Sequence, residues 1–417
     1  MFKIYRTGLL IAYSLIFLTI ILINSCTSDE DNNIKILPDK MQEYAFSLDS
    51  IAEDLDIIPL TFSKPGSVSD IAWREPYFYI STSDGKQRDK VRIITRSGGQ
   101  VNCLDRPGRG PGEYLSVYDF AVDSNQTIYV NTWHKIVVFD KHFKHLRDIR
   151  WPDDVDMAEM YMHDDHLYLF DMTYRNPVYD WIIYDSLGNI ISTKNYNCYK
   201  QGPVPRRYDI FIFRQNDAFY RYRAIDDTIF SVYNTGWDPQ YLINRKFQDG
   251  YRMFSQEELS SKLRIDHLWE SLYQEHIRVI GGIWGLGGDL LITYDKQHNK
   301  RLRSETVLIK NIEGKMSAKL IYETDYSIRG KALGRGLPND WTGYGSIKPM
   351  SVAVIDSVPH IVSYMDALSL KKMVQSDKFI NSTPGRPEIK NKFIKVADTL
   401  DDNSDPVLLL LKLKQPD

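Results

Sequence analysis

The sequence predicts an all-β protein built as a six-bladed β-propeller, with one helix inserted between the fourth and fifth blades. Two observations predict this fold. Beyond residue 43 the chain alternates between short apolar runs and polar turns, which is typical of β-strands. These strands also recur in units of similar order, and such radial repeats form propellers that leave only short sheet edges exposed.

The clearest repeat unit covers residues 110–140. It contains predicted strands at residues 117–122, 128–130 and 136–139, with a polar turn after the first strand. Comparable units begin near Ser69, Glu159, Asp209, Ile277 and Val352. The six units together predict six blades.

One predicted strand, at residues 55–60, precedes the first unit and has no unit of its own. The sixth unit ends with an apolar run at residues 408–413. We therefore expect the early strand to pair with the last blade and close the ring, because closure protects sheet edges from pairing with other chains.

A helical pattern interrupts the strands after the fourth unit. Ser255 followed by Glu258 matches a capping box. Leu259, Leu263 and Trp269 then follow at mostly helical spacing. This pattern predicts the inserted helix, packed on the rim or on a face of the propeller.

The N-terminus predicts export. Lys3 and Arg6 precede an apolar run at residues 8–23, which is shorter than the roughly 20 residues of a membrane span and fits the core of a signal peptide. Residues 23–26 resemble a bacterial lipobox, which implies lipid attachment at Cys26. We expect a lipoprotein signal peptide at 1–25, an acidic tether at 26–42 and the propeller at 43–417. The alternative is an uncleaved signal anchor.

The charge balance excludes one class of partner. Cleavage after residue 25 leaves 50 basic residues against 55 acidic ones, a net charge of −5. Nucleic-acid binding needs a concentrated basic surface, so no nucleic-acid partner is expected. The acidic run at residues 27–33 is too hydrophilic to fold alone.

Residues 110–140 resemble the NHL repeat of six-bladed propellers in the segments 110–114, 121–123, 128–130 and 136–140. Together with the lipobox, the whole chain resembles the six-bladed propeller lipoproteins of Bacteroidota. That resemblance implies a lipid anchor in the outer membrane. The acidic residues after Cys26 are similar to a signal for export to the cell surface, and a solvated linker is the alternative.

Three connections between predicted blades are candidates for ligand binding: residues 108–114, 201–208 and 334–344. Their arginines offer forked donors for carboxylate or sulfate, and their aromatic rings suit sugars or peptides. For residues 108–112 a turn required by the blade geometry is the favoured alternative. The expected ligand-binding residues are Arg109, Glu113, Tyr114, Arg206, Arg335, Asp340, Trp341 and Tyr344.

A second pattern is acidic. Asp70, Asp119, Glu159 and Asp209 occupy equivalent positions in the innermost strands of blades one to four. They predict a partial carboxylate ring at the channel mouth, able to hold a hard cation such as Ca²⁺. The favoured alternative is that each carboxylate accepts hydrogen bonds from exposed N–H groups of the neighbouring inner strand.

The combined pattern favours a non-catalytic binding module that engages a glycan, a peptide or an envelope protein. The alternative is an enzyme, a lyase or a hydrolase, acting from the central pocket with the acidic ring and Arg335. No nucleophile motif is present, and no cofactor is expected apart from the Ca²⁺ considered above.

Overall fold

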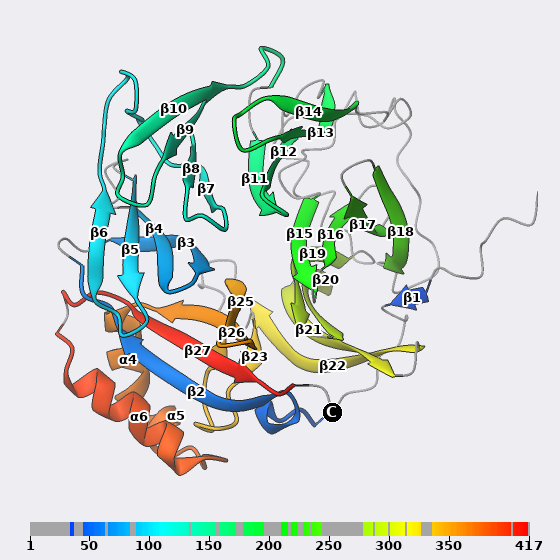
Figure 1. The fold of residues 1–417 in the computed structure, drawn as a ribbon. Coiled ribbons are helices and arrows are strands. Elements are labelled where there is room, and N and C mark those ends of the chain that lie inside the picture. The colour runs from blue at the N-terminus through cyan, green and yellow to red at the C-terminus, as the bar shows by residue number, and fades with distance from the viewer. Residues whose placement is uncertain are drawn as a thin grey trace, which may run out of the picture.

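The computed structural model describes most of the propeller. The described residues are 34–36, 45–62, 66–83, 89–132, 135–155, 158–171, 178–195, 210–215, 218–223, 228–233, 236–243, 278–286, 288–298, 301–312, 315–326, 336–401 and 403–415. The sheets follow one another around a common centre (Figure 1). This arrangement confirms the six-bladed, nearly all-β fold.

Blades one to three are four-stranded antiparallel sheets in which the first strand is innermost. Blade one contains β3 (Ser67–Arg74), β4 (Tyr77–Ser83), β5 (Asp89–Thr95) and β6 (Gln100–Leu104). Blade two contains β7 (Asp119–Val122), β8 (Ile128–Asn131), β9 (Lys135–Phe139) and β10 (His145–Arg150). Blade three contains β11 (Ala158–His163), β12 (His166–Asp171), β13 (Tyr179–Tyr184) and β14 (Ile190–Asn195).

Blades four to six continue the ring, and the last one takes a strand from the N-terminal side. Blade four contains β15 (Ile210–Gln215), β16 (Ala218–Arg223), β17 (Thr228–Tyr233) and β18 (Gly236–Ile243). Blade five contains β19 (Arg278–Leu286), β20 (Asp289–His298), β21 (Arg301–Ile312) and β22 (Lys315–Tyr326). Blade six contains β25 (Ser351–Ile355), β26 (Val358–Met365), β27 (Val407–Leu413) and β2 (Ala52–Pro59).

The closing strand lies where the sequence predicts it. β2 pairs antiparallel with β27, with Leu55 opposite Leu411 and Ile57 opposite Leu409. The N–H of Leu60 donates to the carbonyl of Pro406 at 3.0 Å and extends the pairing beyond the strand. The N-terminal and C-terminal parts of the domain are therefore joined in one sheet.

Blade six is apolar on both faces because its neighbours cover both. Leu408 and Leu410 of β27 pack in the core shared with blade one. Leu409, Leu411 and Leu413 point to the opposite face and pack in the core shared with blade five and the C-terminal helices. This explains why β27 is a continuous apolar run rather than an alternating one.

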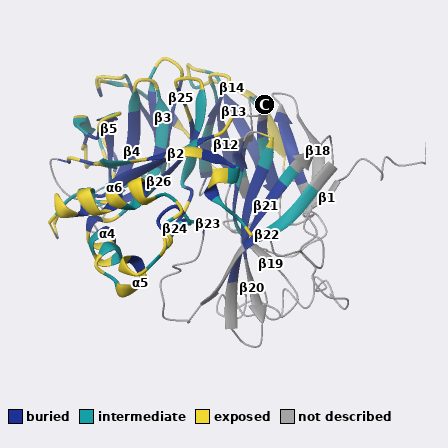
Figure 2. Ribbon diagram, turned by 90° about the horizontal axis from the view of Figure 1, so that it is seen from below, coloured by how far each residue is buried: buried dark blue, intermediate teal, exposed yellow. Residues whose placement is uncertain are grey.

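A helical segment interrupts blade six between β26 and β27, and the sequence analysis did not predict it. It contains α4 (Ala367–Val374), α5 (Asp377–Ile380) and α6 (Pro387–Asp398). These helices expose much of their surface, whereas the strands are largely buried (Figure 2). No helix in the described part of the chain is long and apolar enough to cross a membrane. The helix predicted around residues 255–276 lies outside the described residues.

Four short elements complete the fold. β23 (Leu337–Pro338) and β24 (Ser346–Ile347) form a small hairpin before blade six, and the 3₁₀-helix η1 (Leu48–Ser50) precedes β2. β1 (Ile34–Ile36) adds in parallel to the outer edge of β18 in blade four. The segment expected to be a tether therefore contributes one short strand to the propeller.

Candidate functional site

Three predicted acidic residues lie on neighbouring inner strands. Asp70 is on β3, Asp119 is on β7 and Glu159 is on β11, and β7 contacts both of the other strands. Tyr161, two residues after Glu159, donates its hydroxyl proton to Oε2 of Glu159 at 3.2 Å. All four side chains are half-buried. We call these four residues the axial acidic cluster.

The hydrogen bonds of Asp119 match the structural alternative considered for this ring. Its Oδ2 accepts the N–H of Met160, on the neighbouring inner strand, at 2.7 Å. Its Oδ1 accepts the N–H of Phe120 at 2.8 Å. Asp70 likewise accepts the N–H of Ile71 at 2.7 Å. Asp119 therefore links blade two to blade three at the propeller axis.

The electrostatics of the cluster favour protonation. Burial raises the pKa of Asp70 despite the N–H of Ile71. Burial, and then the charges of Asp70 and Glu159, raise the pKa of Asp119 well above its ordinary range. Burial and the nearby carboxylates also raise the pKa of the Tyr161 hydroxyl. The three carboxyls thus affect one another, because like charges close together disfavour full ionisation.

The axial acidic cluster does not form a metal site in the described part of the chain, where no group of three acidic, histidine or cysteine side chains is arranged to hold an ion. Asp209, the fourth predicted member, lies outside the described residues. The Ca²⁺ expectation therefore gains no support from the geometry of the other three.

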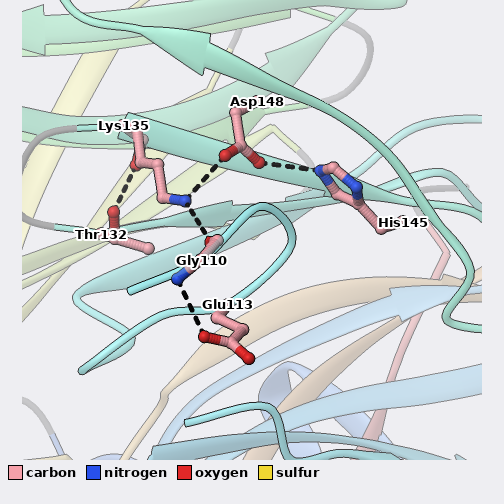
Figure 3. A network of polar contacts seen from close by, with 6 residues as sticks. All are labelled: Gly110, Glu113, Thr132, Lys135, His145 and Asp148. Carbon is pink, nitrogen blue, oxygen red and sulfur yellow. Dashed lines mark hydrogen bonds and ion pairs between the residues drawn. The ribbon is translucent and has the colours of Figure 1, made fainter. Parts of the chain in front are cut away.

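The loop at residues 108–114 is tied to the outer strands of blade two (Figure 3). Glu113 accepts the N–H of Gly110 at 2.8 Å. Lys135 donates to the carbonyl of Gly110 at 3.2 Å and to Asp148 at 2.7 Å. Asp148 also contacts Nε2 of His145 at 2.8 Å. These contacts make the loop a fixed turn, and Arg109 and Glu113 remain exposed on it.

Gly112 explains part of the glycine pattern in this loop. Its φ is +71°, a region that side chains rarely adopt, and a Cβ there would lie 2.7 Å from the ring of His145. Tyr114 is only 3% exposed and donates its hydroxyl proton to the carbonyl of Leu104 at 2.8 Å. Tyr114 therefore joins blades one and two, and its ring offers no exposed face to a ligand, contrary to the expectation for this residue.

Trp341 is also placed differently from the expectation. It is 0% exposed and packs in the core beside blade six. Its Nε1 donates to Asp49 at 3.1 Å, and the guanidinium of Arg386 lies 3.9 Å from the ring centroid. Arg386 also pairs with Asp49. Because the core and Arg386 cover the ring of Trp341, the ring cannot stack on a ligand in this structure.

The neighbours of Trp341 hold the same junction together. Oδ1 of Asp340 accepts the N–H of Leu48 at 2.9 Å, and the carbonyl of Asp340 accepts the N–H of Gly385. Tyr344 is half-buried against the same core. We call Asp49, Asp340, Trp341 and Arg386 the N-terminal clasp, because they join the segment before β2 to the segment before α6. Arg206 and Arg335 lie outside the described residues.

The six blades around a common centre make this protein a six-bladed β-propeller. The chain belongs to the family described as "Domain of unknown function (DUF4934)", whose model matches residues 31–412. The comparison with curated proteins gives no match. The resemblance of residues 110–140 to the NHL repeat stays a prediction.

Three solved structures resemble this chain to different degrees. A Bacteroides fragilis protein described as exported is 19% identical, with a TM-score of 0.61, and the match covers 92% of this chain and 99% of that chain. A gluconolactonase of Xanthomonas campestris is 12% identical, with a TM-score of 0.41 over 92% of this chain and 97% of that chain. A streptogramin B lyase is 12% identical, with a TM-score of 0.40 over 73% and 94%. Only the fold follows from the first of these likenesses, and nothing is concluded from the other two.

Proposed function

We propose that this protein is an exported, lipid-anchored propeller of the outer membrane that binds a ligand without transforming it. The ligand is a glycan, a peptide or another envelope protein, and it engages the axial acidic cluster through its hydrogen-bond donors or a cationic group. The predicted signal peptide and Cys26 support this location, and so does the likeness to a propeller described as exported.

The observation that carries the proposal is the position of three mutually interacting carboxyls on adjacent inner strands. Asp70, Asp119 and Glu159 each keep part of their surface exposed to solvent, and Asp119 lies near the charges of the other two. Tyr161 adds an aromatic ring with a hydroxyl held by Glu159. Carboxylates beside an aromatic ring suit sugar hydroxyls and peptide amines, because the ring orients the ligand while the oxygens accept its donors.

A binding experiment tests the site. We expect Glu159→Gln to weaken binding of the best ligand from a glycan and peptide array by about 1–3 kcal/mol, because a charged hydrogen-bond acceptor is lost. Titration calorimetry with the purified full chain measures the change. Glu113→Gln is the matched control, since it removes the same charge from an exposed loop. Weaker binding for Glu113→Gln alone would move the site to the loop at residues 108–114.

One observation favours the enzyme alternative. The raised pKa of Asp119 beside Glu159 is an arrangement that can supply a general acid and a general base. In that case Glu159→Gln would abolish turnover of a bound ligand while leaving its affinity nearly unchanged. Product formation by the wild-type chain, monitored by mass spectrometry, would replace the binding proposal with a lyase or hydrolase.

The anchor has its own test. We expect Cys26→Ser to release the protein into the soluble fraction, because loss of the thiol removes the lipid attachment and acyl chains supply the membrane affinity. Cell fractionation and metabolic labelling with a fatty acid measure this. Cys103→Ser is the control, since Cys103 is a free cysteine within blade one. A Cys26→Ser protein that remains in the membrane would point to an uncleaved anchor.

A further inference from the structure

The buried side-chain amide of Asn131, beside the axial acidic cluster, has an oxygen that accepts no hydrogen bond from the described residues. Asn131 ends β8 and is 0% exposed. Its Nδ2 donates to the carbonyl of Ala158 on β11 at 2.6 Å. Its Oδ1, within the part of the chain that the structure describes, has no hydrogen-bond partner. A buried acceptor without a donor is costly, so a neighbouring group is expected to satisfy it.

The register of β7 and β8 identifies the neighbour. Asp119 lies directly opposite Asn131 in this antiparallel pair. Side chains at opposite positions share one face of the sheet, with Cβ atoms about 4.5–5.5 Å apart. Both side chains also reach the same strand of blade three, because Asp119 accepts the N–H of Met160 while Asn131 donates to Ala158. A carboxyl O–H on Asp119 is therefore a donor that the strand pairing places on the same face of the sheet as the Asn131 side chain.

The surroundings of Asp119 disfavour a third negative charge. From β3 it faces Asp70, and from β11 it faces Glu159 and Tyr161. The largest influences on Asp119 are its burial, the charges of Asp70 and Glu159, and two backbone N–H groups. Removing water from these carboxyls and keeping all of them charged would be unfavourable, whereas one neutral acid relieves the repulsion.

We propose that Asp119 is a neutral carboxylic acid whose proton is donated to Oδ1 of Asn131, and that a cationic group entering the axial acidic cluster displaces this proton. In that step the O–H bond of Asp119 breaks, the proton passes to solvent and the resulting carboxylate pairs with the cation. The displacement of the proton by a cation rests on the proposed function, whereas the neutral state of Asp119 does not.

Asp119→Asn tests the neutral acid without any ligand. The carboxamide has one oxygen, so it keeps one of the two hydrogen bonds from the backbone N–H groups of Phe120 and Met160, and its nitrogen supplies an N–H donor in place of the carboxyl proton. The lost hydrogen bond lowers the stability of the variant by an amount that does not change with pH, so the pH dependence still reports on the carboxyl proton. Because a raised pKa stabilises the folded state at low pH and loses that contribution as pH rises, the wild type should weaken relative to the variant above about pH 4. We expect the ratio of the variant's folding equilibrium constant to that of the wild type to rise by up to tenfold per pH unit.

Asp185→Asn is the matched control. Asp185 accepts the N–H groups of Leu187 and Asn189 at 2.9 and 2.8 Å in the turn before β14. Hydrogen bonds from Asn189 lower its pKa, so the stability that it contributes is present above about pH 4 and is lost below it. The ratio for Asp185→Asn should therefore fall as pH rises. The same fall for Asp119→Asn, or a flat profile, would overturn the neutral acid.

A direct measurement covers the case in which Asp119→Asn does not fold. With aspartate carboxyls labelled with ¹³C in the full chain, the Asp119 signal should retain the shift of a protonated carboxyl at about pH 6, where ordinary aspartates are ionised. Resonance assignment can use Asn131→Ala, which removes the acceptor and should move the Asp119 titration to lower pH. An Asp119 signal that is already that of a carboxylate at this pH would overturn the proposal.

Displacement of the proton is tested with ethylammonium, a small cationic probe. Calorimetry in buffers of different ionisation enthalpy should show release of about one proton per bound probe in the wild type and none in Asp119→Asn. Binding without proton release would overturn the displacement step. Absence of binding, together with a protonated Asp119 signal, would refute the proposed ligand site and leave the neutral acid supported.

Discussion

Deletion of residues 1–60 should prevent the propeller from folding. The deletion removes β2, so β27 loses its outer partner and blade six keeps a long exposed apolar edge. It also removes Leu48, Ala52 and Leu55, which are fully buried. The lost burial of these side chains, at about 1.5–3 kcal/mol for each leucine, adds to the loss of every β2–β27 hydrogen bond, and the two losses together are comparable to the net stability of an ordinary domain. Soluble yield and circular dichroism measure the outcome.

A shorter deletion is the control, because it distinguishes the effect of losing the closing strand β2 from the effect of losing the residues that precede it. Removal of residues 1–33 leaves β1, η1 and β2 in place, and this protein should melt within a few degrees of the full chain. A folded, cooperative domain after removal of all 60 residues would show that β2 does not close the ring.

Replacement of Trp341 by alanine should lower the free energy of unfolding by about 3–5 kcal/mol, the range for large aromatic side chains in a core. The change leaves a cavity beside blade six, removes the donor to Asp49 and uncovers the guanidinium of Arg386. Denaturant unfolding of the full chain measures the loss.

Arg109→Ala is the control for Trp341→Ala. Arg109 is exposed on the loop at residues 108–114, and surface changes of this kind usually alter stability by about 0.5 kcal/mol or less. If Trp341→Ala were as stable as the wild type, the N-terminal clasp would not stabilise the fold. Such a result would restore Trp341 as a candidate for ligand contact.

The blades could be predicted because their signals are local. The alternation of apolar runs and polar turns predicts the central strands of the blades, as residues 128–130 and 136–139 show by their agreement with β8 and β9. Ring closure was predictable for a related reason: a strand left without a unit has to pair somewhere. The outer strands carry weaker patterns, because one of their edges faces solvent.

The helices in blade six had sequence signals that the repeat pattern concealed. Pro387 opens α6, and Ile389, Phe393 and Ala397 are buried at four-residue spacing. Ser376 caps α5 by accepting the N–H of Phe379 at 3.2 Å. The repeat pattern predicts no strand in this segment, because the fourth strand of blade six is β2.

The candidate site was predictable in part. The equivalent positions of Asp70, Asp119 and Glu159 follow from the repeat, so the sequence places them together. The burial of Tyr114 and Trp341 does not follow from it, because an aromatic ring in a loop has the same sequence pattern whether it packs inward or faces a ligand. Asn131 was missed because a lone asparagine in an apolar strand gives no signal until its partners are known.

The pairing of β2 with β27 sets the order of events during folding. Residues 52–59 and 407–413 are separated by most of the chain, so their sheet cannot form until the last residues have been synthesised. Contacts between distant segments are slow to form, because a long loop must close before the contacts stabilise it. Meanwhile β2 has no partner strand, and unpaired strand edges promote aggregation. Folding of this domain therefore finishes at its C-terminus, and a chain that stops short of residue 407 leaves the ring open.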